Sequence, residues 1–145
     1  MTAAYWAIGV MLVVFAVVDI TSGVRQWRNV GRPLSYWLRG PLLDAESRAG
    51  YDRGSLVLGI ASAFFAIMCA DGALAGPRLG RGTALGPVWF YVGWPALAGL
   101  LVFTGLFTTI MNFNRPRFLV PPHLRGELGA IAGRRRRRRD HQLLI

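Results

Sequence analysis

The sequence has no lysine, a single cysteine and few acidic side chains. All 17 basic residues are arginine, against seven aspartates and glutamates, so the formal net charge is +10. The one cysteine, Cys69, excludes an intramolecular disulfide. No cysteine accompanies either histidine, so neither belongs to the ligand set of a typical zinc site. We therefore expect no metal centre and no cofactor.

Motifs of the common enzyme classes are also missing. The glycine-rich stretch at residues 76–86 lacks the GxxxxGK[ST] pattern of a phosphate-binding loop. Both histidines, His123 and His141, lie in the C-terminal tail, whereas nucleophilic hydrolysis needs a base held beside its nucleophile in an ordered pocket. The sequence therefore predicts a protein without catalytic activity.

Charge is almost absent from three long apolar stretches. They cover residues 3–21, 55–76 and 88–111, and Asp19 and Asp71 are the only charged residues within them. Each is close to the ~20 residues that a helix needs to cross ~30 Å of hydrocarbon. The rest of the chain offers too little polar sequence to cover three such helices in water. We predict an all-α integral membrane protein with three transmembrane helices, whose membrane domain spans residues 1–117.

The arginines predict the orientation of these spans. Six lie between the first two stretches and nine after the third, but only two lie between the second and the third. Because positively charged loops stay in the cytoplasm, the N-terminus should lie outside, and loop 22–54 and the C-terminal tail inside. Cleavage of the first stretch as a signal peptide would send both arginine-rich segments across the membrane, so we expect a retained helix. The predicted location is the cell (inner) membrane.

Small residues mark a packing face in the second stretch. Four of them recur at spacings of four, three and four, on one side of a helix: Gly59, Ala63, Ala66 and Ala70. Shorter pairs occur in the first and third stretches: Gly9 with Ala16, and Ala98 with Gly105. In lipid, helices associate where small residues let their backbones approach closely. We expect these faces to pack the three helices together, with self-association as the alternative.

Arginines and aromatic residues alternate at the start of loop 22–54. Candidate contacts with lipid or a partner are Arg25, Trp27, Arg28 and Trp37. Such a mixture also occurs in nucleic-acid-binding segments, but beside two membrane helices the nearer anions are lipid phosphates. We predict a cytoplasmic interfacial loop, followed by a short helix starting near Pro41 that leads into the second span.

Asp19 and Asp71 are the two carboxylates at membrane depth. Charges in such places often mark ion or proton pathways. In the predicted topology Asp19 lies at the inner boundary and Asp71 toward the outer one, so the two cannot touch. We expect each to form an end cap or an ion pair, with Arg25, Arg53 and Arg115 as candidate partners of Asp19. A proton or cation site is the alternative.

The tail over residues 118–145 is basic and rich in proline, and we expect it to be flexible. Prolines flank the apolar triplet of Phe118, Leu119 and Val120. These prolines predict an extended segment whose triplet is exposed, either to the membrane interface or to another protein. Farther along, the tail carries six consecutive arginines: Arg134, Arg135, Arg136, Arg137, Arg138 and Arg139.

The arginine run predicts an anionic phospholipid partner. Each basic residue near an anionic leaflet contributes about 1 kcal/mol of attraction, which salt screens. In a soluble chain the run would suggest nucleic acid, but a membrane tether makes lipid the nearer anion. We expect a non-catalytic accessory or interaction subunit anchored to anionic lipid, with another membrane protein or a second copy as its protein partner. The alternative is a small transporter or channel subunit, although the spans offer few polar residues to line a path.

Overall fold

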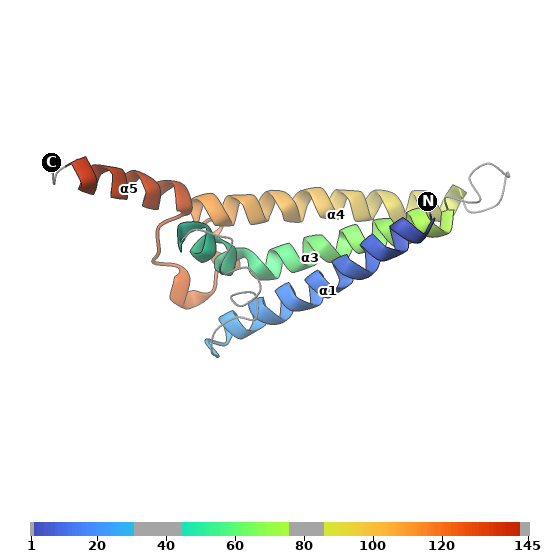
Figure 1. Cartoon of the computed structure of the whole chain (residues 1–145), viewed down its shortest axis with the longest axis horizontal. Helices are drawn as coiled ribbons and strands as arrows, with labels where there is room; N and C mark the ends of the chain where they lie inside the picture. The colour runs from blue at the N-terminus through green and yellow to red at the C-terminus, as the bar shows by residue number, and fades with distance from the viewer. Residues whose placement is uncertain (1, 31–44, 76–85, 143–145) are drawn as a thin grey trace.

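Three long helices lie side by side in an antiparallel arrangement, and a shorter helix extends from one end (Figure 1). The computed structural model describes residues 2–30, 45–75 and 86–142. Its elements are α1 (Thr2–Trp27), α3 (Ala45–Ala75), α4 (Gly86–Phe113), the 3-10 turns η2 (Arg117–Leu119) and η3 (Pro122–Leu124), and α5 (Ala130–Gln142). Within these ranges there is no strand, which confirms the all-α class.

The three long helices are long and apolar enough to cross a membrane. The candidate spans are Ala3–Trp27, Ser47–Leu74 and Tyr91–Phe113, as expected of a multi-pass membrane protein. The helices are longer than the sequence predicts, since α1 continues through residues 22–27 and α3 begins at Ala45. Much of segment 22–54, which the sequence predicts to be an interfacial loop, is therefore helical. The short helix expected to start near Pro41 is continuous with the second span from Ala45 onward, and Pro41 itself lies outside the described residues.

Helix α3 lies between α1 and α4 and packs against both (Figure 1). On the α1 side, a Cβ added to Gly59 would lie 2.7 Å from the backbone nitrogen of Ile20. A Cβ added to Gly23 of α1 would lie 2.6 Å from the Cβ of Leu56. The two backbones therefore approach as closely as glycine allows, which is the geometry that favours helix association in lipid.

The small-residue face expected on α3 is divided in the structure. Gly59 and Ala66 are buried, whereas Ala63 and Ala70 are half-buried. Gly59 contacts α1, as described above, but two further glycines of α3 turn toward α4. A Cβ on Gly54 would lie 2.6 Å from the Phe107 ring, and one on Gly50 would lie 2.8 Å from Met111. Glycines of α3 thus serve two neighbouring helices.

Helix α4 packs through aromatic rings rather than through its expected small-residue pair. The Phe64 and Phe103 rings stack with their centroids 5.6 Å apart, and the Phe107 ring fills the space above Gly54. Ala98 and Gly105 lie instead on the exposed side of α4, and nothing approaches within 4 Å of a Cβ placed on Gly105. The expectation that this pair packs the third span is wrong, because the side of α4 that faces α3 carries Gly99 instead, where a Cβ would lie 2.7 Å from the Phe64 ring.

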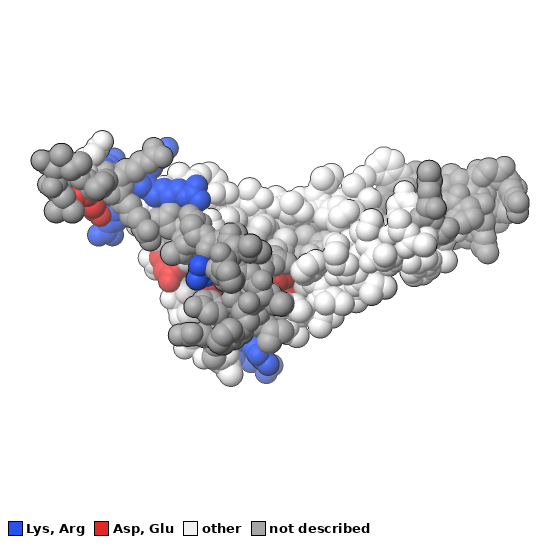
Figure 2. Space-filling model, in the orientation of Figure 1, with Lys and Arg blue, Asp and Glu red and all other residues white. Residues whose placement is uncertain are grey.

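Among the described residues, most charged side chains lie at the end of the molecule that carries α5. On the face shown in Figure 2, the coloured atoms lie around α5 and the adjoining ends of the long helices, whereas the middle of the three-helix unit is uncoloured. Large apolar side chains on the long helices are exposed, among them Val10, Val14 and Val17 on α1 and Leu101 on α4. Such a surface suits contact with hydrocarbon, where exposed apolar side chains carry no penalty.

We predict that Gly23→Ala and Gly59→Ala each destabilise the three-helix unit by about 1–3 kcal/mol, because the added methyl groups overpack the α1–α3 contact. The measurement is thermal unfolding of the purified protein in detergent. Gly105→Ala is the matched control, since its new methyl group meets nothing within 4 Å. Equal melting temperatures for all three variants would show that the α1–α3 backbones are not in close contact.

Candidate functional site at the arginine-rich end

Polar side chains fill the α1–α3 interface at one end of the three-helix unit. This end, called the arginine-rich end below, is formed by the last turns of α1 and α4 and the first turns of α3. Six polar residues at helical spacing are at most 9% exposed there: Asp19, Ser22 and Gln26 on α1, and Ser47, Tyr51 and Ser55 on α3. The Tyr51 hydroxyl donates a hydrogen bond to Oδ1 of Asp19, and the side chains of Gln26 and Asp52 are hydrogen-bonded. These bonds join α1 to α3 beside the glycine contacts.

The structure gives Asp19 a partner that the sequence does not suggest. The expected partners are an arginine or a helix cap, and the structure shows the Tyr51 hydroxyl donating to the carboxylate. Arg53, one of the candidate arginines, bonds the tail instead. Sequence reasoning missed Tyr51, although Ser47, Tyr51 and Ser55 recur every four residues and so share one face of α3.

Arg53 connects α3 to the C-terminal tail. Its side chain is only 3% exposed, and Nη1 donates a 2.6 Å hydrogen bond to the carbonyl oxygen of Leu128. The same nitrogen lies 3.6 Å from Oε2 of Glu127, whose side chain is 47% exposed. The guanidinium is buried, and a buried charge is costly unless it keeps its hydrogen bonds and its counter-charge. The stability of α3 therefore depends on residues 127–128 lying beside Arg53.

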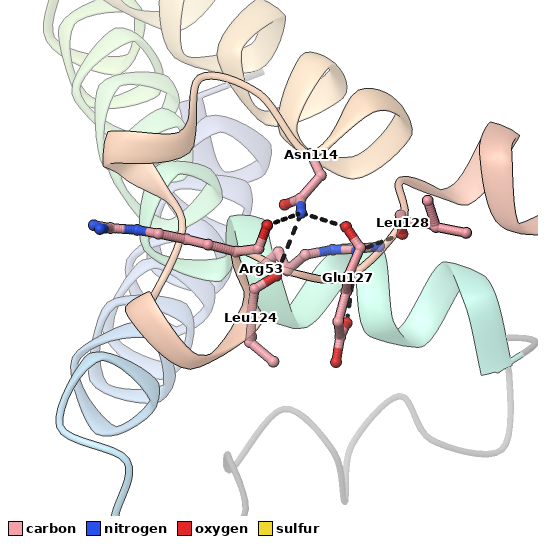
Figure 3. A network of polar contacts seen from close by, with 6 residues as sticks. Arg53, Asn114, Leu124, Glu127 and Leu128 are labelled. Atoms are coloured by element: carbon pink, nitrogen blue, oxygen red, sulfur yellow. Dashed lines mark hydrogen bonds and ion pairs between the residues drawn. The ribbon is translucent and has the colours of Figure 1, made fainter.

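Asn114 holds the tail in a folded-back path at the end of α4 (Figure 3). Its φ of 55° places it in the left-handed region, where asparagine is tolerated and where many helices end. Its Nδ2 donates to the carbonyl oxygens of Glu127 at 2.7 Å, Leu124 at 3.3 Å and Arg125 at 3.4 Å. One amide group thus contacts three carbonyls of the turn, of which that of Leu124 also accepts from the backbone N–H of Glu127 at 3.2 Å.

The apolar triplet of the tail is partly buried, contrary to expectation. Val120 is fully buried and clusters with Val57 and Ile110, while Leu119 is half-buried against the same cluster. Phe118 alone is exposed as predicted, at 70%. The prolines do not keep the segment extended, because it forms the turns η2 and η3 and thereby brings Val120 onto α3 and α4.

The arginine run is helical rather than irregular. Residues 130–142 form α5, and Nη2 of Arg134 donates a 3.4 Å hydrogen bond to Oγ of Ser47 near the start of α3. The chain enters α5 through Gly129, which packs against the backbone of Asn112 so closely that a Cβ would clash with it. The expected flexible tail is therefore a docked segment over residues 115–129 followed by a helix.

The other candidate contact residues are spread over this end of the molecule. Arg25 and Arg28 are exposed, Trp27 is half-buried, and Trp37 lies outside the described residues. Within α5, Arg134, Arg135, Arg136 and Arg139 are exposed, and the side chains of Arg137 and Arg138 are not described. Asp71 is half-buried toward the other end of α3, and the loop arginines near it in sequence lie outside the described residues.

The chemistry available at the arginine-rich end is binding through hydrogen bonds and positive charge. Within residues 2–30, 45–75 and 86–142 no three metal-ligating side chains come together. Comparison of the chain with protein-family models, curated proteins and solved structures finds no match.

We predict that Asn114→Gly releases the tail, because glycine keeps the left-handed backbone but removes all three amide-to-carbonyl bonds. A loss of about 2 kcal/mol would raise the undocked population about thirtyfold. The rate of tryptic cleavage after Arg125 in detergent measures this population, since proteolysis follows the opened state. Asn112→Ala is the control, because the Asn112 amide bonds only Thr108 of its own helix. Equal cleavage rates would contradict the role of Asn114.

Proposed function

We propose that the protein is a non-catalytic accessory or interaction subunit of the cytoplasmic membrane, whose docked tail presents α5 to anionic lipid. The observation that carries this proposal is the position of α5. It projects beyond the three-helix unit at the arginine-rich end and is attached to that unit through Arg134, Gly129 and Asn114 (Figure 1). The first turn of α5, with Arg134, is thereby held near the level where three apolar helices would leave the bilayer, and the rest of α5 extends onward from there.

The arrangement of charge on α5 favours lipid headgroups over a protein groove. Six consecutive residues cover more than one and a half turns of helix, so arginine positions fall on every side of α5. A helix that is polar all round has no apolar face to bury against a protein core. Like charges at spacings of three and four also repel one another and weaken the helix. A surface of phosphate groups relieves this repulsion, so lipid contact and helix formation support each other.

A protein partner is the second element of the proposal. In a membrane, a second copy or another membrane protein could pack against the exposed sides of α1 and α4, which carry most of the exposed apolar residues. Nucleic acid remains the weaker candidate for α5, because its distance from the membrane is limited by the docked tail. The alternative of a transporter or channel subunit draws on the buried polar residues around Asp19, but their bonds join α1 to α3 at the arginine-rich end.

The proposed orientation predicts the outcome of reporter fusions. Fusions after Gly40 and after Arg125 should report cytoplasm, and a fusion near Gly82 should report the outside, because positively charged segments are retained in the cytoplasm. Each site is fused to alkaline phosphatase in one variant and to green fluorescent protein in another. The ratio of the two signals does not depend on expression level. Phosphatase activity at Gly40 would reverse the orientation and remove α5 from the cytoplasmic leaflet.

The proposed lipid contact predicts a salt-dependent signal from α5. In the Cys69→Ala background, a polarity-sensitive dye on Gln142→Cys of the full-length protein should shift to the blue as the anionic fraction of the vesicles rises. The shift should shrink between about 0.05 M and 0.5 M salt as the Debye length falls. Changing Arg135 to Arg139 to glutamine should abolish it. Crosslinking of specific RNA or DNA to α5 in intact cells, lost in the same variant, would contradict the lipid assignment.

A further inference from the structure

A cavity of about 580 Å³, open to the surface, lies beside the end of α4 and is lined by Thr109, Arg115, Pro116 and Arg117. The side chains of both arginines are exposed. Within residues 2–30, 45–75 and 86–142 neither guanidinium forms an ion pair with a carboxylate, while Glu127 pairs with Arg53. A cavity of this size fits a small ligand, and two such guanidiniums favour an anionic one.

The backbone that carries these arginines is fixed at both ends. Asn114 precedes Arg115 and is bonded to three carbonyls of the folded-back tail. Arg117 begins η2, and Val120 just beyond it is fully buried. The two arginines therefore need little ordering of their backbone when they bind, which lowers the entropic cost of association.

An apolar row on the exposed side of α4 leads to the cavity. Leu101, Gly105, Thr109 and Phe113 follow one another at spacings of four, so they lie along one side of the helix. Leu101 and Phe113 are 65% and 61% exposed, and Gly105 leaves a notch between its neighbours. The Thr109 hydroxyl donates to the carbonyl of Gly105 at 2.8 Å, so its hydrogen is already used within the helix. The row is about 18 Å long, close to the ~15 Å of hydrocarbon in one leaflet.

We propose that this cavity binds the phosphate of one anionic phospholipid, with Arg115 and Arg117 donating to its oxygens and an acyl chain lying along the row. Free phosphate offers the same anion, but of these two ligands only a lipid would also occupy the apolar row adjoining the cavity. The two arginines could also serve only to compensate the dipole at the C-terminal end of α4. That role would explain their positive charge, but it would not explain the cavity or the apolar row. The inference goes beyond the proposed function, because it concerns a single bound lipid at α4 and not the surface contact of α5.

The test is lipid retention by the full-length protein. The protein is delipidated in neutral detergent, incubated with equal amounts of phosphatidylglycerol and phosphatidylcholine, and examined by native mass spectrometry. We expect one phosphatidylglycerol to be retained preferentially. Arg115→Gln with Arg117→Gln should weaken its apparent affinity at least about tenfold. Arg135→Gln with Arg136→Gln removes the same charge from α5 and should leave that lipid bound. Equal losses in the two double variants would overturn the proposal.

A second variant tests the acyl row without changing charge. Gly105→Leu fills the notch but meets no protein atom at its Cβ, so the fold should be kept, as circular dichroism can verify. We expect this variant to retain phosphatidylglycerol more weakly, again by about tenfold, because the added side chain occupies the path of the acyl chain. Unchanged retention would overturn the placement of the lipid. Displacement of the lipid by millimolar inorganic phosphate would also overturn it and identify a free-phosphate site.

Discussion

The structure of the arginine-rich end depends on the amide group of Asn114. Helix α4 ends there in the left-handed region, which turns the following chain back toward α3. Its three hydrogen bonds then hold residues 124–127 beside the helix end, where Arg53 reaches the carbonyl of Leu128. Without this turn the tail would continue away from the three-helix unit. Neither Val120 nor α5 would then lie against α3 and α4. The bonds of this one side chain therefore act together with Arg53, buried Val120 and the Arg134–Ser47 contact to join the tail to the fold.

The three-helix unit obeys a second constraint, which is the division of glycines on α3. Gly59 admits the backbone of α1, whereas Gly50 and Gly54 admit Met111 and Phe107 of α4. A helix that packs on two sides needs small residues on both, since lipid provides no hydrophobic force to press the helices together. This arrangement places α3 in the middle and leaves one side of α1 and of α4 exposed along most of their length.

The sequence predicts the coarse architecture because hydrocarbon thickness imposes a length and an apolar composition on each span. It also predicts a helical lead into the second span. The packing partners are harder to predict, because small residues such as Ala98 and Gly105 look the same on a packed face and on an exposed one. The docked tail could not be predicted, since its stability comes from contacts distant in sequence, such as Arg53 with Leu128 and Val120 with Val57. Proline content suggested an extended tail, but burial of Val120 outweighs that local preference.

The buried position of Arg53 gives the chain an order of assembly. Its partners, Glu127 and the carbonyl of Leu128, are synthesised some 75 residues after it. Until residues 127–128 are made, the Arg53 guanidinium lacks the carbonyl and the carboxylate that it contacts in the structure. The docked tail supplies both groups after α4 has been synthesised. A chain cut before Leu128 would keep all three apolar helices but lack the carbonyl to which Arg53 donates.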